Sequence, residues 1–580
     1  MNERKAVIME KNMKPKSENS SDLKSRADHI ISRLSLKEKI GQMMMVGFYG
    51  EEITPELEEM ISEYRPGGII YFARNLKNPR QVFKLSRNLQ ELSCNTIGLP
   101  LLIAAVDEGG IVTRVPGMTH YPGAMSWGAA DDTKALKEMA AAKARELRYL
   151  GVNFNLAPVL DVNNNPQNPI IGVRAAGGDP EKVAELGRVY IEGLQEKEIA
   201  ACGKHFPGHG DTEVDSHHDL PVIEHDRERL ERVELAPFRA AIEAGVESIM
   251  MAHIAFPALT GSRKEPATLS SKVVYELLRE ELNFSGIIIT DCLEMEGIRG
   301  VTGTAEGAVR AVAAGCDIAL ISHSRSLQIK AFKKLEEAVK EGRISRKRID
   351  RSVRRIIQLK LKISQGDFMD SFAAEKSFSQ EKFTSLKNRG KRAAEKIARH
   401  AITRLPGSRR YLPFNPDELP QLWLIDMRAE EGKTAVESGQ RNREFEDLDT
   451  DIEILARKLA ENDFDPRILR SPGQKKIDEL VFSARKNLSE EGKKLPGAVV
   501  FMEELQEEPG WFNPLVFMAE SKMPAVFVIQ RSPYGLDKLK QAEVLITYDS
   551  SPMHISSIFE ILTGEDEPAG SLPVSLPGKD

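Results

Sequence analysis

The chain has 580 residues, 41% of them hydrophobic and 29% charged, and its formal net charge at pH 7 is −6. This length exceeds what one hydrophobic core fills, so we expect at least two domains. The small net charge does not indicate a nucleic acid or a membrane as partner, and no apolar run is long enough to span a bilayer. Residues 1–24 are polar and lack the apolar core of a signal peptide, which predicts a disordered tail on a cytoplasmic protein.

Apolar runs alternate with helical patterns between residues 25 and 363. Ser35 and Glu38 form a capping box that predicts a helix start, and Asp179 before Pro180 predicts another. Eight runs have the length and composition of buried strands: 42–48, 67–72, 101–106, 153–160, 199–204, 248–254, 286–290 and 316–321. Near-continuous apolar strands that alternate with helices are typical of a parallel sheet, so these runs predict a (β/α)8 barrel over residues 25–363.

The composition changes after the predicted barrel. Residues 364–392 are polar and charged, and predict a linker that crosses the surface. Four further apolar runs follow, at residues 422–425, 498–501, 525–529 and 544–547. They predict a smaller C-terminal α/β sandwich domain over residues 393–580.

A polar loop of unusual composition follows the fifth predicted strand. It runs from Lys204 to His217 and holds three histidines, one lysine and three carboxylates. Asp215 and His217 are two residues apart, so in an extended segment both side chains leave the backbone on the same side. A carboxylate in that position can orient the imidazole and stabilise its protonated form. Functional residues of barrel enzymes follow the C-terminal ends of strands, which is where this loop lies.

Asp291 directly follows the seventh predicted strand, where a carboxylate is suited to act as a nucleophile or to stabilise a cationic transition state. Together with Asp215 and His217, it is consistent with retaining hydrolysis of a glycosidic bond in which an imidazole donates the proton. The rival interpretation is a metal-dependent hydrolase with ligands from the loop: His205, His209, Asp211, Asp215, His217, His218 and Asp219. No His-Glu-x-x-His motif accompanies them, which favours chemistry without a metal.

Several motifs resemble those of glycoside hydrolase family 3, in particular its bacterial β-N-acetylglucosaminidases. They are residues 168–174, 204–217, 547–577 and the segment 290–295, which has Cys292 where the family usually has serine or aspartate. The resemblance implies that Asp291 is the nucleophile, that His217 is the acid/base, and that Asp215 is the partner of His217. It also implies an exo-acting enzyme that needs no metal or other cofactor.

The resemblance further implies which residues bind the sugar. Four of them would contact its hydroxyls and N-acetyl group: Lys204, His205, Arg174 and His253. After the third strand the family usually has Asp-Gln-Glu-Gly-Gly, whereas this chain is one polar residue shorter at 106–110. Asp107 and Arg114 are expected to reach the outer hydroxyls of the sugar from this segment.

The implied substrates are small oligosaccharides. They are either cell-wall fragments in which N-acetylglucosamine (GlcNAc) is linked to N-acetylmuramic acid, or chitooligosaccharides, and the implied role is cell-wall recycling. Three alternatives stay open: a phosphorylase of the same family, a β-glucosidase, and a non-catalytic sugar-binding protein. No oligomeric state follows from the sequence.

Overall fold

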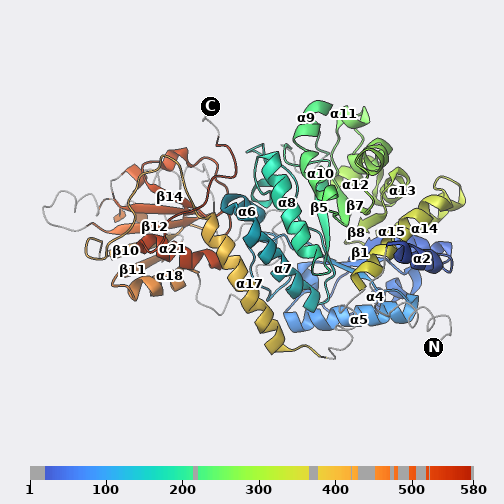
Figure 1. The fold of residues 1–580 in the computed structure, drawn as a ribbon, viewed down its shortest axis with the longest axis horizontal. Helices are drawn as coiled ribbons and strands as arrows, with labels where there is room; N and C mark the ends of the chain where they lie inside the picture. Colours follow the sequence, from blue (N-terminus) through green and yellow to red (C-terminus); the bar gives the residue numbers. More distant parts are fainter. Residues whose placement is uncertain are drawn as a thin grey trace.

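The computed structural model of the chain has two lobes, which lie side by side in Figure 1. The residues that it describes are 20–212, 220–364, 377–419, 421–428, 451–470, 476, 477, 479, 480, 482, 495–503, 518–520 and 523–576. The first lobe contains the N-terminal strands and the second contains the strands after residue 402.

The N-terminal lobe is built on a closed barrel whose parallel strands follow one another in chain order. The strands are β1 Met44–Val46, β2 Gly68–Tyr71, β3 Leu102–Ala105, β4 Phe154–Asn155, β5 Ala200–Phe206, β6 Ser248–Met251, β7 Ile287–Cys292 and β8 Ile318–Ile321. Each overlaps one of the predicted apolar runs, so the predicted barrel is confirmed. Helices cover the outside and side chains fill the inside, which is why these strands are continuously apolar.

Helices surround the barrel, and two of their starts are those that the sequence predicts. Ser35 and Glu38 form a capping box at α3, where the Ser35 N–H donates to Glu38 at 2.7 Å. Asp179 caps α8, with Pro180 in its first turn. The helices of this lobe are α2 Ser20–Ile31, α3 Leu36–Gln42, α4 Pro55–Glu59, α5 Pro79–Ile97, α6 Ala124–Ala130, α7 Thr133–Tyr149, α8 Pro180–Gln195, α9 Arg227–Arg232, α10 Ala236–Glu243, α11 Pro257–Thr260, α12 Glu296–Thr302, α13 Thr304–Ala314, α14 Arg325–Lys340 and α15 Arg346–Ser364.

Helix α2 corrects the predicted extent of the N-terminal tail. It begins at Ser20, so residues 20–24 are helical, and residues 1–19 lie outside the described part of the chain. The helix packs against α15, where Ala27, Ile30 and Ile31 are buried, and this apolar contact accounts for its formation. Among the described helices, none is long and apolar enough to cross a membrane.

The C-terminal lobe is a sheet with the strand order β11-β10-β12-β13-β14-β9. Strand β9 is antiparallel to β14, and the other pairs are parallel. The strands are β9 Thr403–Arg404, β10 Gln421–Asp426, β11 Asp465–Arg470, β12 Gly497–Met502, β13 Ala525–Ile529 and β14 Glu543–Ile546. The four predicted apolar runs correspond to β10, β12, β13 and β14, which confirms the α/β class of this lobe.

Alternate side chains of this sheet enter two different cores, as the two-residue period of a strand requires. Val499 and Val526 share a core with helices α18 Asp451–Ala460 and α21 Ile555–Thr563. Val500 and Phe527, one residue further along their strands, share a core with Met125 of barrel-lobe helix α6. The second core therefore joins the two lobes.

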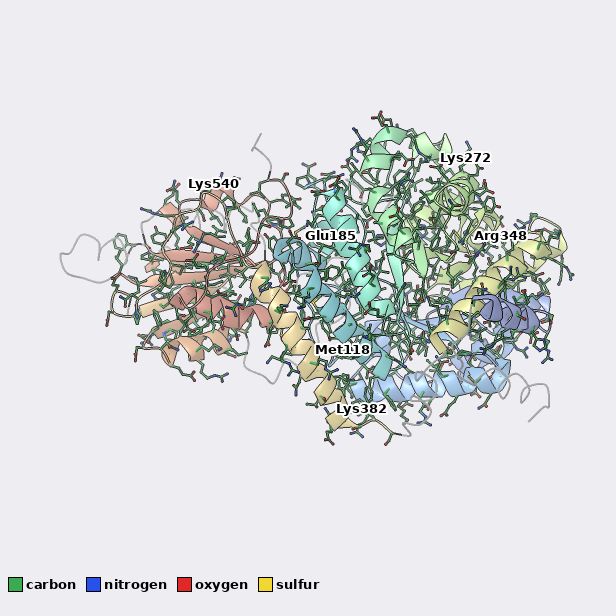
Figure 2. The ribbon with its side chains drawn as sticks, in the orientation of Figure 1. Met118, Glu185, Lys272, Arg348, Lys382 and Lys540 are labelled. Carbon is green, nitrogen blue, oxygen red and sulfur yellow. The ribbon has the colours of Figure 1, made fainter. Side chains whose placement is uncertain are left out.

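Helix α17 Gln380–Ala401 runs between the lobes and packs against α6 and α7. Figure 2 shows Lys382 at the barrel end of this helix, whereas Lys540 lies in the C-terminal lobe. Residues 380–392 were expected to form part of a linker, but they are the first half of this helix. The reason is packing: Phe383 and Gly390 are buried, which an irregular surface segment would not achieve.

Candidate active site

Side chains from four strand ends meet at the carboxyl end of the barrel. Glu108 follows β3, Asp161 follows β4, Lys204 and His205 lie in β5, and Asp291 lies near the end of β7. The C-terminal ends of parallel barrel strands open on one face of the molecule. Residues that are distant in the sequence are therefore brought into one cluster, which the contacts below define.

Glu108 is at the centre of a buried ion network. Its carboxylate accepts hydrogen bonds from Arg174 Nε at 2.9 Å and Nη2 at 2.8 Å, and from Lys204 Nζ at 2.7 Å. Burial alone would raise the pKa of Glu108, but the two cations hold it well below its usual range. Arg174 and Lys204 are thus fixed against each other by one ionised carboxylate.

Asp107 contacts different partners. Its Oδ1 pairs with Lys143 Nζ at 2.9 Å, and its Oδ2 accepts from the backbone N–H groups of Arg114 at 3.1 Å and Val115 at 3.3 Å. The side chains of Asp107 and Lys143 are at most 2% exposed. The side chains of adjacent residues in an extended segment point to opposite sides. Asp107 therefore points toward Lys143 and away from the cluster, whereas Glu108 points into the cluster. We therefore assign no sugar contact to Asp107.

Asp161 orients two histidines of the polar loop. Its Oδ2 lies 2.8 Å from His205 Nδ1, and its Oδ1 accepts from the backbone N–H groups of His205 at 3.2 Å and His209 at 2.7 Å. Burial alone would raise the pKa of Asp161, but His205 holds it below its ordinary value. Burial lowers the pKa of His209 to about 4, so His209 is neutral at pH 7.

Asp291 is the partly exposed carboxylate of the cluster. Its Oδ1 accepts from the Cys292 N–H at 2.7 Å. Burial alone would raise the pKa of Asp291, but His205, His253, the Cys292 N–H and Lys204 hold it below its ordinary value. Asp291 is therefore ionised at neutral pH and open to a ligand, and an ionised carboxylate of this kind can act as a nucleophile.

His253 lies beside the end of β7 and is 1% exposed. Its Nδ1 is 2.8 Å from Thr268 Oγ1, and its Nε2 is 3.1 Å from the Cys292 carbonyl oxygen. A carbonyl oxygen only accepts, so Nε2 carries the proton in that contact. His253 thereby holds the backbone immediately after Asp291.

The catalytic pair predicted from the sequence, Asp215 and His217, lies outside the described residues, and so its role stays a prediction. The beginning of its loop is described. Asn168 Nδ2 donates to the carbonyls of His209 at 2.8 Å and Gly210 at 2.9 Å, which ties the loop after β5 to the loop after β4.

No catalytic or sugar-binding role was predicted from the sequence for two members of the cluster, Glu108 and Asp161. Both are buried carboxylates: Asp161 directly follows a predicted strand, and Glu108 is the second residue after one. Their position was a signal available in the sequence. Arg174, Lys204, His205, His253 and Asp291, which were predicted, all belong to the cluster or contact it.

The fold and the cluster define a barrel protein with an ionised carboxylate set among cationic side chains at the carboxyl end of its strands. Residues 35–359, more than half of the chain, match the model described as the glycosyl hydrolase family 3 N-terminal domain. The chain belongs to glycosyl hydrolase family 3, and it is a glycoside hydrolase.

Relatives and solved structures agree with this membership. A β-hexosaminidase A of Pseudoalteromonas piscicida is 38% identical over 54% of this chain and 56% of its own length, so the match spans about half of that relative. A β-hexosaminidase of Thiobacillus denitrificans is 35% identical over 50% of this chain and 81% of its own length. The structure of a family 3 β-N-acetylglucosaminidase from Paenibacillus sp. str. FPU-7 is similar with a TM-score of 0.81 and 36% identity, covering 93% of this chain and 99% of that one.

Proposed function

We propose that this chain is an exo-acting β-N-acetylglucosaminidase that hydrolyses its substrate with retention of configuration. The observation that carries the proposal is Asp291, a partly exposed carboxylate with a lowered pKa, set beside Lys204 and His205. The names of the relatives, two β-hexosaminidases and one β-N-acetylglucosaminidase, support an N-acetylhexosaminide as substrate.

The proposed reaction has two steps. Asp291 attacks the anomeric carbon while His217 gives its proton to the leaving oxygen, so one C–O bond forms as another breaks. Neutral His217 then takes a proton from water, whose oxygen displaces Asp291 from the anomeric carbon. The two inversions restore the original configuration. Asp215 stabilises the imidazolium form of His217, and the roles of this pair come from the motif resemblance.

The sugar is proposed to bind through N–H donors that are already in place. Arg174, Lys204 and His205 would donate to its hydroxyls and N-acetyl oxygen. Glu108 and Asp161 hold these three side chains before a ligand arrives, which lowers the entropy lost on binding. The proposed substrates are GlcNAc-containing cell-wall fragments or chitooligosaccharides, with cell-wall recycling as the proposed role.

Covalent trapping tests the assignment of the nucleophile. A 5-fluoro-N-acetylglucosaminyl fluoride forms the glycosyl-enzyme faster than water removes it, so the adduct is expected on the peptide that contains Asp291. The Asp291→Asn variant is the matched control and is expected to give no adduct. An adduct mapped to any other carboxylate would contradict the mechanism.

A product assay separates hydrolysis from phosphorolysis. With an aryl GlcNAc substrate, free GlcNAc is expected both with and without inorganic phosphate. GlcNAc 1-phosphate as the main product in phosphate buffer would replace the proposed hydrolase with a phosphorylase.

A further inference from the structure

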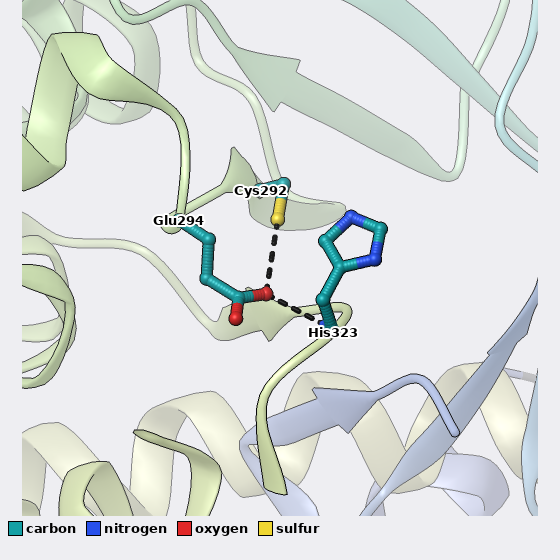
Figure 3. A group of neighbouring side chains, drawn as sticks. All are labelled: Cys292, Glu294 and His323. Atoms are coloured by element: carbon teal, nitrogen blue, oxygen red, sulfur yellow. Dashed lines mark hydrogen bonds between the residues drawn. The ribbon is translucent and has the colours of Figure 1, made fainter. Parts of the chain in front are cut away.

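A cluster of possible metal ligands lies next to Asp291. Cys292 is the last residue of β7, Glu294 lies two residues after it, and His323 follows β8. Figure 3 shows the three side chains converging. One ligand atom from each residue lies within 4.8 Å of the other two, and Cys292 Sγ is 3.6 Å from Glu294 Oε2.

The barrel backbone brings these residues together. Strands β7 and β8 are parallel neighbours, and Cys292 is paired in register with Leu320. Glu294 is fixed because its carboxylate accepts from the backbone N–H groups of residues 322, 323 and 324 at 2.7–2.8 Å. The carboxylate is therefore positioned without any contribution from a bound ion, and the His323 ring stands beside it (Figure 3).

The donor set selects one class of ligand. A thiol sulfur, an imidazole nitrogen and a carboxylate oxygen are the three protein ligands of zinc, whereas magnesium and calcium prefer oxygen alone. Three protein ligands leave a fourth position for solvent, and exposed His323 lies on the solvent side. The cluster thus has the composition of an open site for a thiophilic divalent cation.

Arg74 is the charged neighbour that such an ion would meet. Its Nη1 is 3.2 Å from His323 Nδ1. Because arginine only donates hydrogen bonds, Nδ1 of His323 is the acceptor and carries no proton. Arg74 is also held by the carbonyls of Phe48 at 2.9 Å and Ser322 at 2.8 Å. It keeps two partners if His323 turns to an ion, but its positive charge makes the site weaker than a dedicated structural zinc site.

We propose that Cys292, Glu294 and His323 form a binding site for a zinc-class divalent cation, and that the bound cation inhibits the enzyme. On binding, the cation replaces the thiol proton, which passes to solvent, and a metal–sulfur bond forms without any redox change. The inhibition rests on the proposed role of Asp291. The cation would sit one residue away, and its positive charge would reduce the reactivity of the Asp291 carboxylate toward the anomeric carbon.

Binding is tested on the full chain without any activity assay. Equilibrium dialysis with Zn²⁺ should give one bound equivalent, and Co²⁺ should produce a sulfur-to-cobalt charge-transfer band. Cys292→Ser should abolish the band, and both Cys292→Ser and His323→Gln should weaken binding by at least about tenfold. His225→Asn is the matched control, because His225 belongs to the other described cluster of possible ligands, Asp211, His225 and Glu234, and should leave the band unchanged.

The results that would overturn the site are specific. A cobalt band that survives in Cys292→Ser, or zinc binding that is lost in His225→Asn, would place the ion elsewhere, and wild-type protein that binds no zinc would remove the site. Zinc titration of turnover then tests inhibition, with the half-inhibiting concentration expected to rise at least about tenfold in His323→Gln. Binding without inhibition would overturn the inhibitory part, whereas failure of the proposed activity would leave the dialysis and cobalt results to decide the site.

Discussion

The proton donor decides how strongly turnover depends on the leaving group. A natural disaccharide has a poor leaving alcohol that must be protonated, whereas an activated aryl group leaves as a stable anion. His217→Ala should therefore lose about 10² to 10⁴ in kcat/KM on the disaccharide and far less on the aryl substrate. His218→Ala, next in the chain, serves as the control. Equal losses on both substrates in His217→Ala would contradict the assigned role.

The neighbouring carboxylates Glu108 and Asp107 allow a matched comparison within the site. Glu108→Gln leaves the buried cations Arg174 and Lys204 without their charge partner, and Asp107→Asn does the same to Lys143. Each change should cost about 3–5 kcal/mol and lower the melting temperature. Of the two variants, only Glu108→Gln should also raise KM for an aryl GlcNAc, because Glu108, unlike Asp107, holds the proposed sugar-binding donors Arg174 and Lys204. A comparable rise in Asp107→Asn would show that the two networks act as one.

The site residues that could be predicted are those with a reactive or charged side chain that also lie at the end of a predicted strand within a recognisable motif. Lys204, His205 and Asp291 sit at strand ends in distinctive motifs. Glu108 was missed because its neighbour Asp107 has the same chemistry, and side-chain direction depends on the exact register of the chain after β3. The segment after β3 is one residue shorter than the family pattern, which changes the direction in which each of its side chains points. The contacts of the two carboxylates in the structure are needed to decide which one faces the cluster.

At the scale of elements, the strands buried on both faces were predictable because their apolar runs are continuous. Strand β11, Asp465–Arg470, was missed because it is an edge strand with exposed charged residues. Helix α17 was missed for a related reason. Its buried positions recur every three or four residues within a strongly charged sequence, so the composition concealed a helix that packs on only one side.

Replacement of Gly390 in α17 by alanine would have two opposing effects on the stability of the fold. Alanine is the better helix former by about 1 kcal/mol. However, a Cβ at this position would lie 2.2 Å from Glu146 Oε1 and 2.4 Å from the Tyr121 hydroxyl. These atoms form a buried hydrogen bond with each other at 2.5 Å, so they cannot move apart cheaply. The overpacking cost, about 1–3 kcal/mol, should exceed the gain in helix propensity.

We therefore expect Gly390→Ala to lower the melting temperature measured by scanning calorimetry. Lys391→Ala, one residue along the same helix and exposed, is the control and should leave the melting temperature nearly unchanged. A melting temperature of Gly390→Ala equal to or above that of the wild type would mean that α17 does not approach α7 as closely as the structure has it.

At the scale of the whole molecule, the C-terminal lobe contacts the two loops that carry the ion pair of the site. Asp549 accepts from the Gly123 N–H at 3.0 Å in the loop after β3. The Pro573 carbonyl accepts from the Gly178 N–H at 3.0 Å in the loop after β4. The lobe therefore fixes the loops of Glu108 and Arg174 relative to each other, which gives it a structural role in the site.

Asp549 also makes this contact dependent on pH. It is 1% exposed, and burial alone would raise its pKa, but His554, His120 and the Gly123 N–H lower the pKa to about 2. His554 Nε2 is 3.2 Å from Asp549 Oδ1. A carboxyl whose pKa is lowered on folding adds stability above its unfolded pKa of about 3.9, and loses it as the pH falls through the folded value. The shift corresponds to about 2–3 kcal/mol at neutral pH.

Asp549→Asn keeps the shape of this side chain and removes its charge. At pH 7 the variant should melt at a lower temperature than the wild type, by an amount that reflects about 2–3 kcal/mol. Between pH 4 and pH 2 the wild-type carboxyl becomes protonated and resembles the amide, so the two melting temperatures should converge. Ser408→Ala, in the same lobe but away from the barrel loops, is the control. A gap that stays constant from pH 7 to pH 2 would show that Asp549 acts through its shape and hydrogen bonds, and not through its charge at the junction of the lobes.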